Sequence, residues 1–314
     1  MSIFKIYGKK IWVAGHNGMV GKAVVRQLKK NCEILTVDRQ SLDLTIQQDV
    51  NNWLAHNKPD AIILCAAKVG GILANDRYPA EFIYKNLMIE ANIINAAHTN
   101  EISKLLFLGS SCIYPKHAPQ PMKESALLTG PLENTNEWYA LAKIAGIKLC
   151  QAYRKQYGSN FISAMPTNLY GPYDNFDLET SHVIPALIRK THEAKLNNQN
   201  EIIVWGTGKP LREFMHVDDC ADGIIFLLEN YSDMEHVNIG TGQELSIGDL
   251  IEMIKSAVEF KGETEFDTSK PDGTPRKLLN SEKIQALGWS PNISLQKGLK
   301  ETYQWYLQNM REIN

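Results

Sequence analysis

A tyrosine and a lysine near the middle of the chain have the spacing needed for proton transfer. Tyr139 and Lys143 are four residues apart in the helical pattern NEWYALAKIAGIKLC, so they share one helix face. A lysine cation beside a tyrosine hydroxyl lowers the pKa of the phenol from about 10 toward neutrality, which makes the phenol a usable acid. With 12 tyrosines in the chain, one such pair is also expected by chance.

A serine, a cysteine and a histidine extend this set. Ser110 and Cys112 lie in LGSSCIYP, which ends an apolar run, and His182 lies in the polar segment DLETSHVIPALIRK. A thiol whose pKa is lowered by cations can act as a base at a carbon beside a ketone, and histidine can supply the acid. On residue type alone, a buried apolar role for Cys112 and a helix-cap or surface role for His182 are the commoner outcomes.

A glycine-rich turn near the N-terminus offers a place for a phosphate group. Gly15, Gly18 and Gly21 punctuate IWVAGHNGMVG between an apolar strand pattern and the helical pattern VGKAVVRQLKK. Glycines at such a turn let backbone N–H groups approach a pyrophosphate at the positive end of a helix. The turn therefore predicts a dinucleotide site, although a plain strand-to-helix turn has the same glycines.

The second strand ends in EILTVDR, and its last two residues favour different dinucleotides. Asp38 could accept a hydrogen bond from a ribose 2′-hydroxyl, as in NAD, whereas Arg39 could pair with the 2′-phosphate of NADP. We expect NADP. In the LDL segment at 42–44, Asp43 is a candidate acceptor for the adenine amino group and equally a solvated helix cap.

These side chains need a scaffold, and the first half of the chain predicts one. Short apolar runs (KIWVAG, EILTVD, AIILCAA, KLLFLGSS) alternate with helical patterns, which is typical of βαβ units and a parallel, doubly wound sheet of the Rossmann type. Because these strands are apolar throughout, we expect helices on both faces of the sheet. The predicted fold class is α/β.

The second half has a different texture and predicts a smaller α/β lobe. Segments rich in Pro, Gly and Asn replace the regular alternation after about residue 165. We expect a dinucleotide-binding domain at 1–167 and a substrate-binding lobe at 168–314, with the helical segment 216–230 able to pack back on the first domain.

Composition narrows the class of protein. The 314 residues carry a net charge of −2, which gives no long-range attraction to nucleic acid or anionic membrane. Five cysteines without metal-ligand spacing indicate a reducing compartment and no metal site. The N-terminus resembles no leader, and AIILCAA is too short to span a bilayer, so we expect a cytoplasmic enzyme.

The motifs together resemble the extended short-chain dehydrogenase/reductase family. The match is strongest to its bifunctional branch, which converts GDP-4-keto-6-deoxy-D-mannose to GDP-L-fucose with NADPH. It rests on the strings AAKVGGI, LGSSCIYP, TNEWYALAKIAGIKLC, MPTNLYGPYDNF, SHVIPALIRK, REFMHVDD and KPDGTPRKLL, which cover nearly the whole chain.

The resemblance implies roles for the five chemical residues. Ser110 would hold the substrate oxygen, Tyr139 would donate its proton, and Lys143 would bind the nicotinamide ribose and tune Tyr139. Cys112 and His182 would be the base and the acid of a 3,5-epimerisation. The implied cofactor-binding residues are Gly15, Asn17, Gly18, Met19, Val20, Gly21, Arg39, Asp43, Leu44, Leu108, Gly109, Lys143, Pro166, Asn168, Leu169 and His182.

The same resemblance places the GDP-sugar in the second lobe. It implies substrate contacts for Lys190, Trp205, Arg212 and Asp272, and Arg276 is a further candidate cation for the pyrophosphate. Relatives often carry arginine at the position of Lys190, where lysine offers a point charge in place of bidentate pairing. Some relatives have arginine at the position of Asn17, so more of the NADP preference rests on Arg39 here.

Several alternatives stay open at this stage. The same residues would serve a 3,6-dideoxy substrate giving GDP-colitose. A plain nucleotide-sugar 4-reductase or 4-epimerase would have no use for the thiol base, and a regulator that binds a dinucleotide without turnover is compatible with the fold. A homodimer formed by a helix pair of the sheet domain is expected, since dimers are usual in the resembled family.

Overall fold

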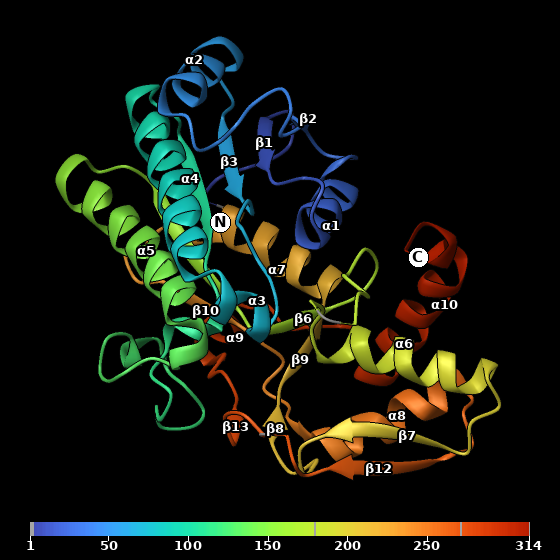
Figure 1. Ribbon diagram of the computed structural model, residues 1–314. Coiled ribbons are helices and arrows are strands. Elements are labelled where there is room, and N and C mark those ends of the chain that lie inside the picture. The colour runs from blue at the N-terminus through green and yellow to red at the C-terminus, as the bar shows by residue number, and fades with distance from the viewer. Residues whose placement is uncertain (1–2, 179, 271, 314) are drawn as a thin grey trace.

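A six-stranded parallel sheet forms the centre of the computed structural model, which describes residues 3–178, 180–270 and 272–313 (Figure 1). The strand order is β10-β5-β4-β3-β1-β2, and every pairing between neighbours is parallel. The strands are β1 (Lys10–Ala14), β2 (Glu33–Leu35), β3 (Ala61–Leu64), β4 (Lys104–Leu108), β5 (Phe161–Pro166) and β10 (Val237–Ile239). The expected α/β class with a Rossmann-type sheet is confirmed.

Helices cover both faces of this sheet, as the apolar strands require. The helices connected with it are α1 (Met19–Leu28), α2 (Gln47–Asn57), α3 (Ile72–Arg77), α4 (Pro79–Thr99), α5 (Glu137–Tyr157) and α7 (Val217–Asn230). One apolar core lies between the sheet and the α1/α7 side, and a second lies beneath α2, α4 and α5. Burial on both faces explains why β3 and β4 have no alternating polar positions.

The chain returns to the first lobe after leaving it. The segment expected to pack back forms α7, which lies against α1, where the Gln27 amide donates to the Asp218 carbonyl at 2.7 Å. The following strand, β10, then becomes the sixth strand beside β5, which the sequence pattern did not predict. The boundary expected between residues 167 and 168 stays a prediction.

The second lobe is built from short strands and four helices in the described ranges. Its strands are β6 (Asn168–Tyr170), β7 (Glu201–Trp205), β8 (Leu211–Arg212), β9 (Phe214–His216), β11 (Leu245–Ser246), β12 (Glu263–Asp267) and β13 (Arg276–Lys277). The helices of this part of the chain are α6 (Val183–Leu196), α8 (Ile247–Val258), α9 (Glu282–Ala286) and α10 (Leu295–Ile313), of which α9 packs back on the sheet lobe through Ile284. A third core unites α6, α8 and α10, the three helices that lie close together in the second lobe (Figure 1).

The packing of α7 on the first lobe can be tested by making a cavity. Ile224 is fully buried on α7, so Ile224→Ala should lower the free energy of unfolding by about 2 to 5 kcal/mol in urea titrations. Leu196→Ala is the matched control, because that side chain is 62% exposed and its loss should cost little. An equal, small effect of both changes would contradict the packing described here.

Candidate active site

Ser110 and Cys112 lie at the carboxyl end of β4, in the middle of the parallel sheet. Ser110 is the N-cap residue of a single 3₁₀ turn, η1 (Ser111–Ile113), and its Oγ accepts a hydrogen bond from the Cys112 backbone N–H at 3.5 Å. Ser110 is half-buried and Cys112 is buried, with 8% of its surface exposed. The carboxyl edge of a parallel sheet is where ligands of doubly wound folds bind.

Helix α5 brings Tyr139 and Lys143 to the same place. The Lys143 ammonium group donates to the Leu108 carbonyl at 3.1 Å and lies 5.8 Å from the centre of the Tyr139 ring. Lys143 is only 2% exposed, so its charge sits inside the protein between α5 and β4. The predicted serine, tyrosine and lysine are therefore brought together by the fold.

Burial changes the expected acidities of the two proton-transfer groups. It raises the pKa of Tyr139 well above its ordinary value, and the neighbouring Cys112 and Glu90 raise it further. It also raises the pKa of Cys112, although Lys277 and Lys143 oppose this shift. The expectation that cations lower both pKa values is wrong in direction: desolvation raises both, and at Cys112 it outweighs the nearby cations. Tyr139 is held as a phenol, the form that donates a proton.

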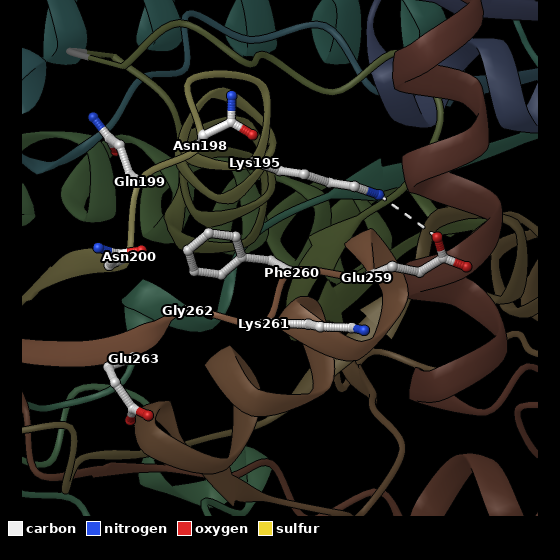
Figure 2. Close-up of a pocket in the computed structure, with 9 residues that line it drawn as sticks. All are labelled: Lys195, Asn198, Gln199, Asn200, Glu259, Phe260, Lys261, Gly262 and Glu263. Atoms are coloured by element: carbon white, nitrogen blue, oxygen red, sulfur yellow. Dashed lines mark ion pairs between the residues drawn. The ribbon is translucent and has the colours of Figure 1, made fainter.

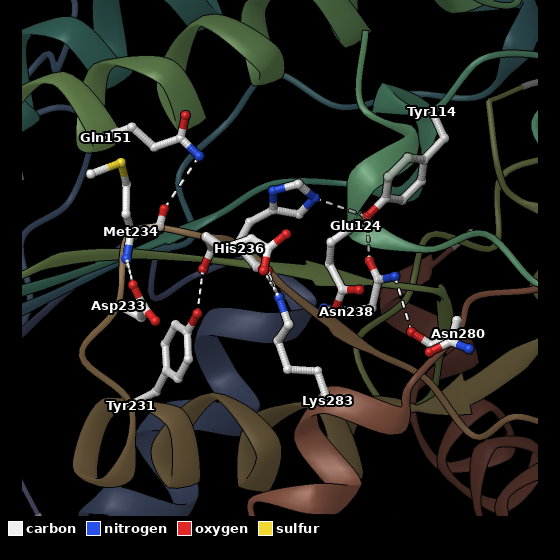
Figure 3. A network of polar contacts seen from close by, with 11 residues as sticks. Tyr114, Glu124, Gln151, Tyr231, Asp233, Met234, His236, Asn238, Asn280 and Lys283 are labelled. Carbon is white, nitrogen blue, oxygen red and sulfur yellow. Dashed lines mark hydrogen bonds and ion pairs between the residues drawn. The ribbon is translucent and has the colours of Figure 1, made fainter. Parts of the chain in front are cut away.

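The loop that carries Cys112 is fixed by a buried polar network (Figure 3). The Tyr114 hydroxyl donates to Asn238 Oδ1 of β10 at 2.5 Å and lies 3.0 Å from His236 Nε2. The Asn238 backbone N–H donates to Glu124 Oε1 at 3.0 Å. This network ties the η1 loop to a strand about 120 residues later in the chain, so Cys112 sits on a supported loop.

His182 approaches the same region from the second lobe. It is the residue before α6, but its side chain makes no capping hydrogen bond in the described structure. The preceding segment docks on the loop after β3, where the Gly71 N–H donates to the Thr180 carbonyl at 3.1 Å. His182 is exposed, yet desolvation by surrounding protein, together with Lys277, lowers its pKa, so the neutral imidazole is favoured at neutral pH.

The glycine turn is shaped to hold a phosphate-bearing ligand. Gly15 has φ +90°, and the Gly18 N–H donates to the Gly15 carbonyl at 3.1 Å. A Cβ on Gly21 would lie 2.1 Å from that carbonyl oxygen, so only glycine allows this close turn. Gly18 caps α1 without a side chain, and Met19 and Val20 open the helix. The free N–H groups at this terminus suit a pyrophosphate.

Asp38 is already engaged by its neighbours. The Asn17 side-chain amide donates to Asp38 Oδ1 at 2.7 Å, and His16 Nε2 lies 3.4 Å from the same oxygen. Arg39 is exposed beside it. Asn17, at the position where some relatives have arginine, thus fixes the orientation of the Asp38 carboxylate.

The remaining predicted cofactor residues line the same edge of the sheet. Asp43 Oδ1 accepts from the Thr45 backbone N–H at 2.9 Å and from its hydroxyl at 2.7 Å, which lowers the Asp43 pKa and makes it a local turn residue. The Asn168 amide donates to the Glu213 carbonyl at 2.8 Å. Leu108 and Pro166 end β4 and β5, and Gly109 follows β4. Leu169 lies in β6, and Leu44 lies in the segment between β2 and α2.

The predicted substrate residues gather in the second lobe. The Lys190 ammonium lies 5.3 Å from the centre of the Trp205 ring, which is 56% exposed. Asp272 accepts hydrogen bonds from Thr207, from the backbone N–H at 2.6 Å and from the hydroxyl at 2.8 Å. Burial lowers the pKa of Arg212, whereas nearby Asp272 raises it. An aromatic face, two cations and a carboxylate therefore form one patch.

Lys277 joins this patch to the cysteine and was missed by sequence reasoning. It pairs in register with Arg212 between β13 and β8, and its charge acts on both Cys112 and His182. Arg276, the candidate cation beside it, is bound instead to Glu244, with Nε 2.8 Å from Oε2. Adjacent strand residues point to opposite faces, so only one of the two can face the site. The sequence signal that could have found Lys277 was the alternation of side-chain direction along a strand in PRKLL.

The surface pocket of Figure 2 lies elsewhere. Its volume is about 440 Å³, and it lies between the end of α6 and the start of β12. Lys195 and Glu259 form an ion pair at 3.6 Å across it. The predicted site residues, all of which lie in the described ranges, do not line it.

Comparison with known proteins identifies the family to which this chain belongs. The model of the NAD dependent epimerase/dehydratase family matches residues 11–240. The chain belongs to this family. A GDP-L-fucose synthase from Sinorhizobium fredii is 59% identical over 99% of the chain and 100% of that protein. A GDP-L-colitose synthase from Yersinia pseudotuberculosis is 40% identical over 95% of the chain and 98% of that protein.

A solved structure from the epimerase/dehydratase family agrees over nearly the whole chain. The GDP-L-fucose synthetase from Naegleria fowleri bound to NADP has a TM-score of 0.90 and 30% identity, covering 99% of this chain and 97% of that one. A nicotinamide dinucleotide is thus the family's cofactor, and the glycine turn fits it.

No helix in the described ranges is long and apolar enough to cross a membrane.

The glycine turn can be tested by adding one methyl group. Gly21→Ala would push Cβ against the Gly15 carbonyl and open the turn, so the affinity for NADPH should fall at least about tenfold in fluorescence titrations. Gly248→Ala is the control, because its nearest neighbour would lie at an ordinary 3.5 Å. Unchanged NADPH affinity in Gly21→Ala would separate this turn from dinucleotide binding.

Proposed function

We propose that this protein is a GDP-L-fucose synthase, which uses NADPH to epimerise carbons 3 and 5 of GDP-4-keto-6-deoxy-D-mannose and to reduce carbon 4. The observation that carries the proposal is the grouping of Cys112 with Ser110, Tyr139 and Lys143 at one strand end. A simple ketoreductase needs the last three but has no use for a thiol. The name of the relative with 59% identity supports the same activity.

The first half of the reaction is proton transfer on the sugar. The ketone at carbon 4 acidifies the protons on carbons 3 and 5, so a thiolate of Cys112 can remove each in turn. Ser110 and Tyr139 donate hydrogen bonds to the enolate oxygen that forms. His182, in its protonated form, returns a proton from the opposite face, which inverts the carbon.

Electrostatics decide how the base and acid acquire their working forms. Burial favours the thiol of Cys112 and the neutral imidazole of His182, whereas the reaction uses the thiolate and the imidazolium. Lys277 stabilises the thiolate and disfavours the imidazolium. The rate of epimerisation should therefore rise with pH as Cys112 loses its proton, and fall with pH as His182 loses its proton.

The second half of the reaction is reduction at carbon 4. When bound, NADPH supplies the hydride. Tyr139 donates a proton to the carbon 4 oxygen as that oxygen gains charge, and Lys143 holds a positive charge beneath the ring. We further propose that Arg39 recognises the 2′-phosphate while Asn17 and His16 engage Asp38.

The GDP group is assigned to the patch in the second lobe. Lys190 and Arg212 would neutralise the pyrophosphate, Trp205 would stack on a ring, and Asp272 would accept hydrogen bonds.

We also propose that the protein forms a homodimer through the outer faces of α4 and α5, which lie side by side in Figure 1. The side chain of Tyr84 on α4 is 62% exposed.

The activity can be tested in deuterated water. Incubation with GDP-4-keto-6-deoxy-D-mannose and NADPH should give GDP-L-fucose with solvent deuterium at carbons 3 and 5, located by NMR. Reduction without deuterium at either carbon would contradict the epimerase half and leave a ketoreductase. Faster turnover of the 3-deoxy substrate would instead favour GDP-colitose synthesis.

The role of the thiol has its own test. Cys112→Ser should lower the rate of deuterium incorporation by about 10² to 10⁴, because a positioned base contributes a factor of that size, while NADPH affinity stays nearly unchanged. Cys32→Ser, at a half-buried cysteine between α1 and β2, is the matched control. Full incorporation by Cys112→Ser would remove this thiol from the mechanism.

A further inference from the structure

A buried glutamate on α4 has no explanation in the chemistry described so far. Glu90 is 2% exposed, and no described group donates a hydrogen bond to either of its carboxylate oxygens. Its Oε2 lies 3.9 Å from the Lys143 ammonium nitrogen. A buried carboxylate without hydrogen-bond donors is costly, and such groups are retained where they serve a function.

The neighbouring helix α5 has a glycine, and therefore no side chain, where it faces this carboxylate. A Cβ on Gly146 of α5 would lie 2.7 Å from Glu90 Oε2 and 2.4 Å from the Phe107 ring. Glycine inside a helix costs roughly 1 kcal/mol relative to alanine, so its presence here fits a need for space. Gly146 and Lys143 are three residues apart and share the helix face that meets α4.

The same face of α4 carries a second buried polar residue aimed at the site. Asn86, four residues before Glu90, accepts a hydrogen bond from the Lys68 backbone N–H at 2.8 Å and donates to the Lys68 carbonyl at 3.0 Å. It thereby fixes the loop after β3. Asn86 and Glu90, on one face of α4, therefore support the active-site edge at two points: the loop at Lys68 and the ammonium group of Lys143.

We propose that Glu90 is a positioning residue, whose carboxylate is the counter-ion that keeps Lys143 an ammonium ion beneath Tyr139. Without it, Lys143 would be a buried charge with the Leu108 carbonyl as its acceptor and the Phe107 ring centre 4.6 Å away, and a buried charge with no counter-ion tends to become neutral. This proposal rests on the proposed function for the use made of Lys143. Within the described ranges, Glu90 is the acidic side chain paired with that lysine.

The direction of the effect follows from the charges around the pair. Burial lowers the pKa of Lys143, and Glu90 opposes this most strongly, followed by Cys112 and Cys65. Tyr139 and Cys150 of α5 are the other titratable groups that face Glu90. Burial raises the pKa of Glu90 to about 8 against the opposing effect of Lys143, so the two groups share protons and titrate as a pair.

The test is to remove the carboxylate in two ways. In Glu90→Gln and Glu90→Met, the pKa of Lys143 falls, so the pH at which carbon 4 reduction is lost on the alkaline side should move down by about 1 to 3 units. The reduction is followed by NADPH oxidation with the already epimerised 4-keto sugar, so that His182 does not enter the pH profile. Glu90→Asp retains the charge and should stay nearer the unaltered protein. Asp219→Asn is the control, because this buried carboxylate on α7 accepts hydrogen bonds from the Asn292 and Ile293 backbone N–H groups, away from Lys143.

A second measurement uses no substrate. The pH titration of Lys143, followed by NMR of ¹³Cε-labelled lysine and assigned by the loss of its signal in Lys143→Arg, should show the same downward shift in both variants. Lower stability with an unchanged titration would make Glu90 merely structural and overturn the proposal. An unaltered protein that fails to turn over the sugar would count against the proposed function, while the titration would still decide the role of Glu90.

Discussion

The site depends on one buried charge, the ammonium group of Lys143. It sits where α5 crosses the end of β4, donates to the Leu108 carbonyl and lies beneath the ring of Tyr139. An ammonium ion with 2% exposure must be held by protein groups, since water does not solvate it. The packing of α5 on the sheet provides the Leu108 carbonyl, and the closeness of α4 provides Glu90.

Burial has opposite consequences for the two halves of the proposed reaction. It keeps Tyr139 as a phenol, which suits a group that must donate a proton to a reduced ketone. It also keeps Cys112 as a thiol, which opposes its use as a base. The cations Lys277 and Lys143 oppose the rise in the Cys112 pKa. Epimerisation therefore depends on positive charge near the cysteine, whereas reduction alone would not.

The two lobes are joined by chemistry as well as by packing. Trp205, Lys190, Asp272 and Arg212 form a patch in the second lobe, and β13 carries Lys277 from that patch to the cysteine. The return of α7 and β10 to the sheet, with Tyr114 bonded to Asn238, fixes the loop at the other side. A nucleotide-sugar spanning both lobes would contact groups that the fold holds at fixed positions.

The sequence by itself determined the features that arise from local spacing. Apolar strands predicted a parallel sheet covered on both faces, three glycines predicted the turn before α1, and four-residue spacing placed Tyr139 and Lys143 on one helix face. Only the tertiary structure decided what long-range packing controls. It placed Glu90 beside a lysine 53 positions later, turned Lys277 and not Arg276 toward the site, and added β10 to the sheet. It also reversed the expected pKa shifts of Tyr139 and Cys112, because desolvation depends on everything packed around a group and not on its sequence neighbours.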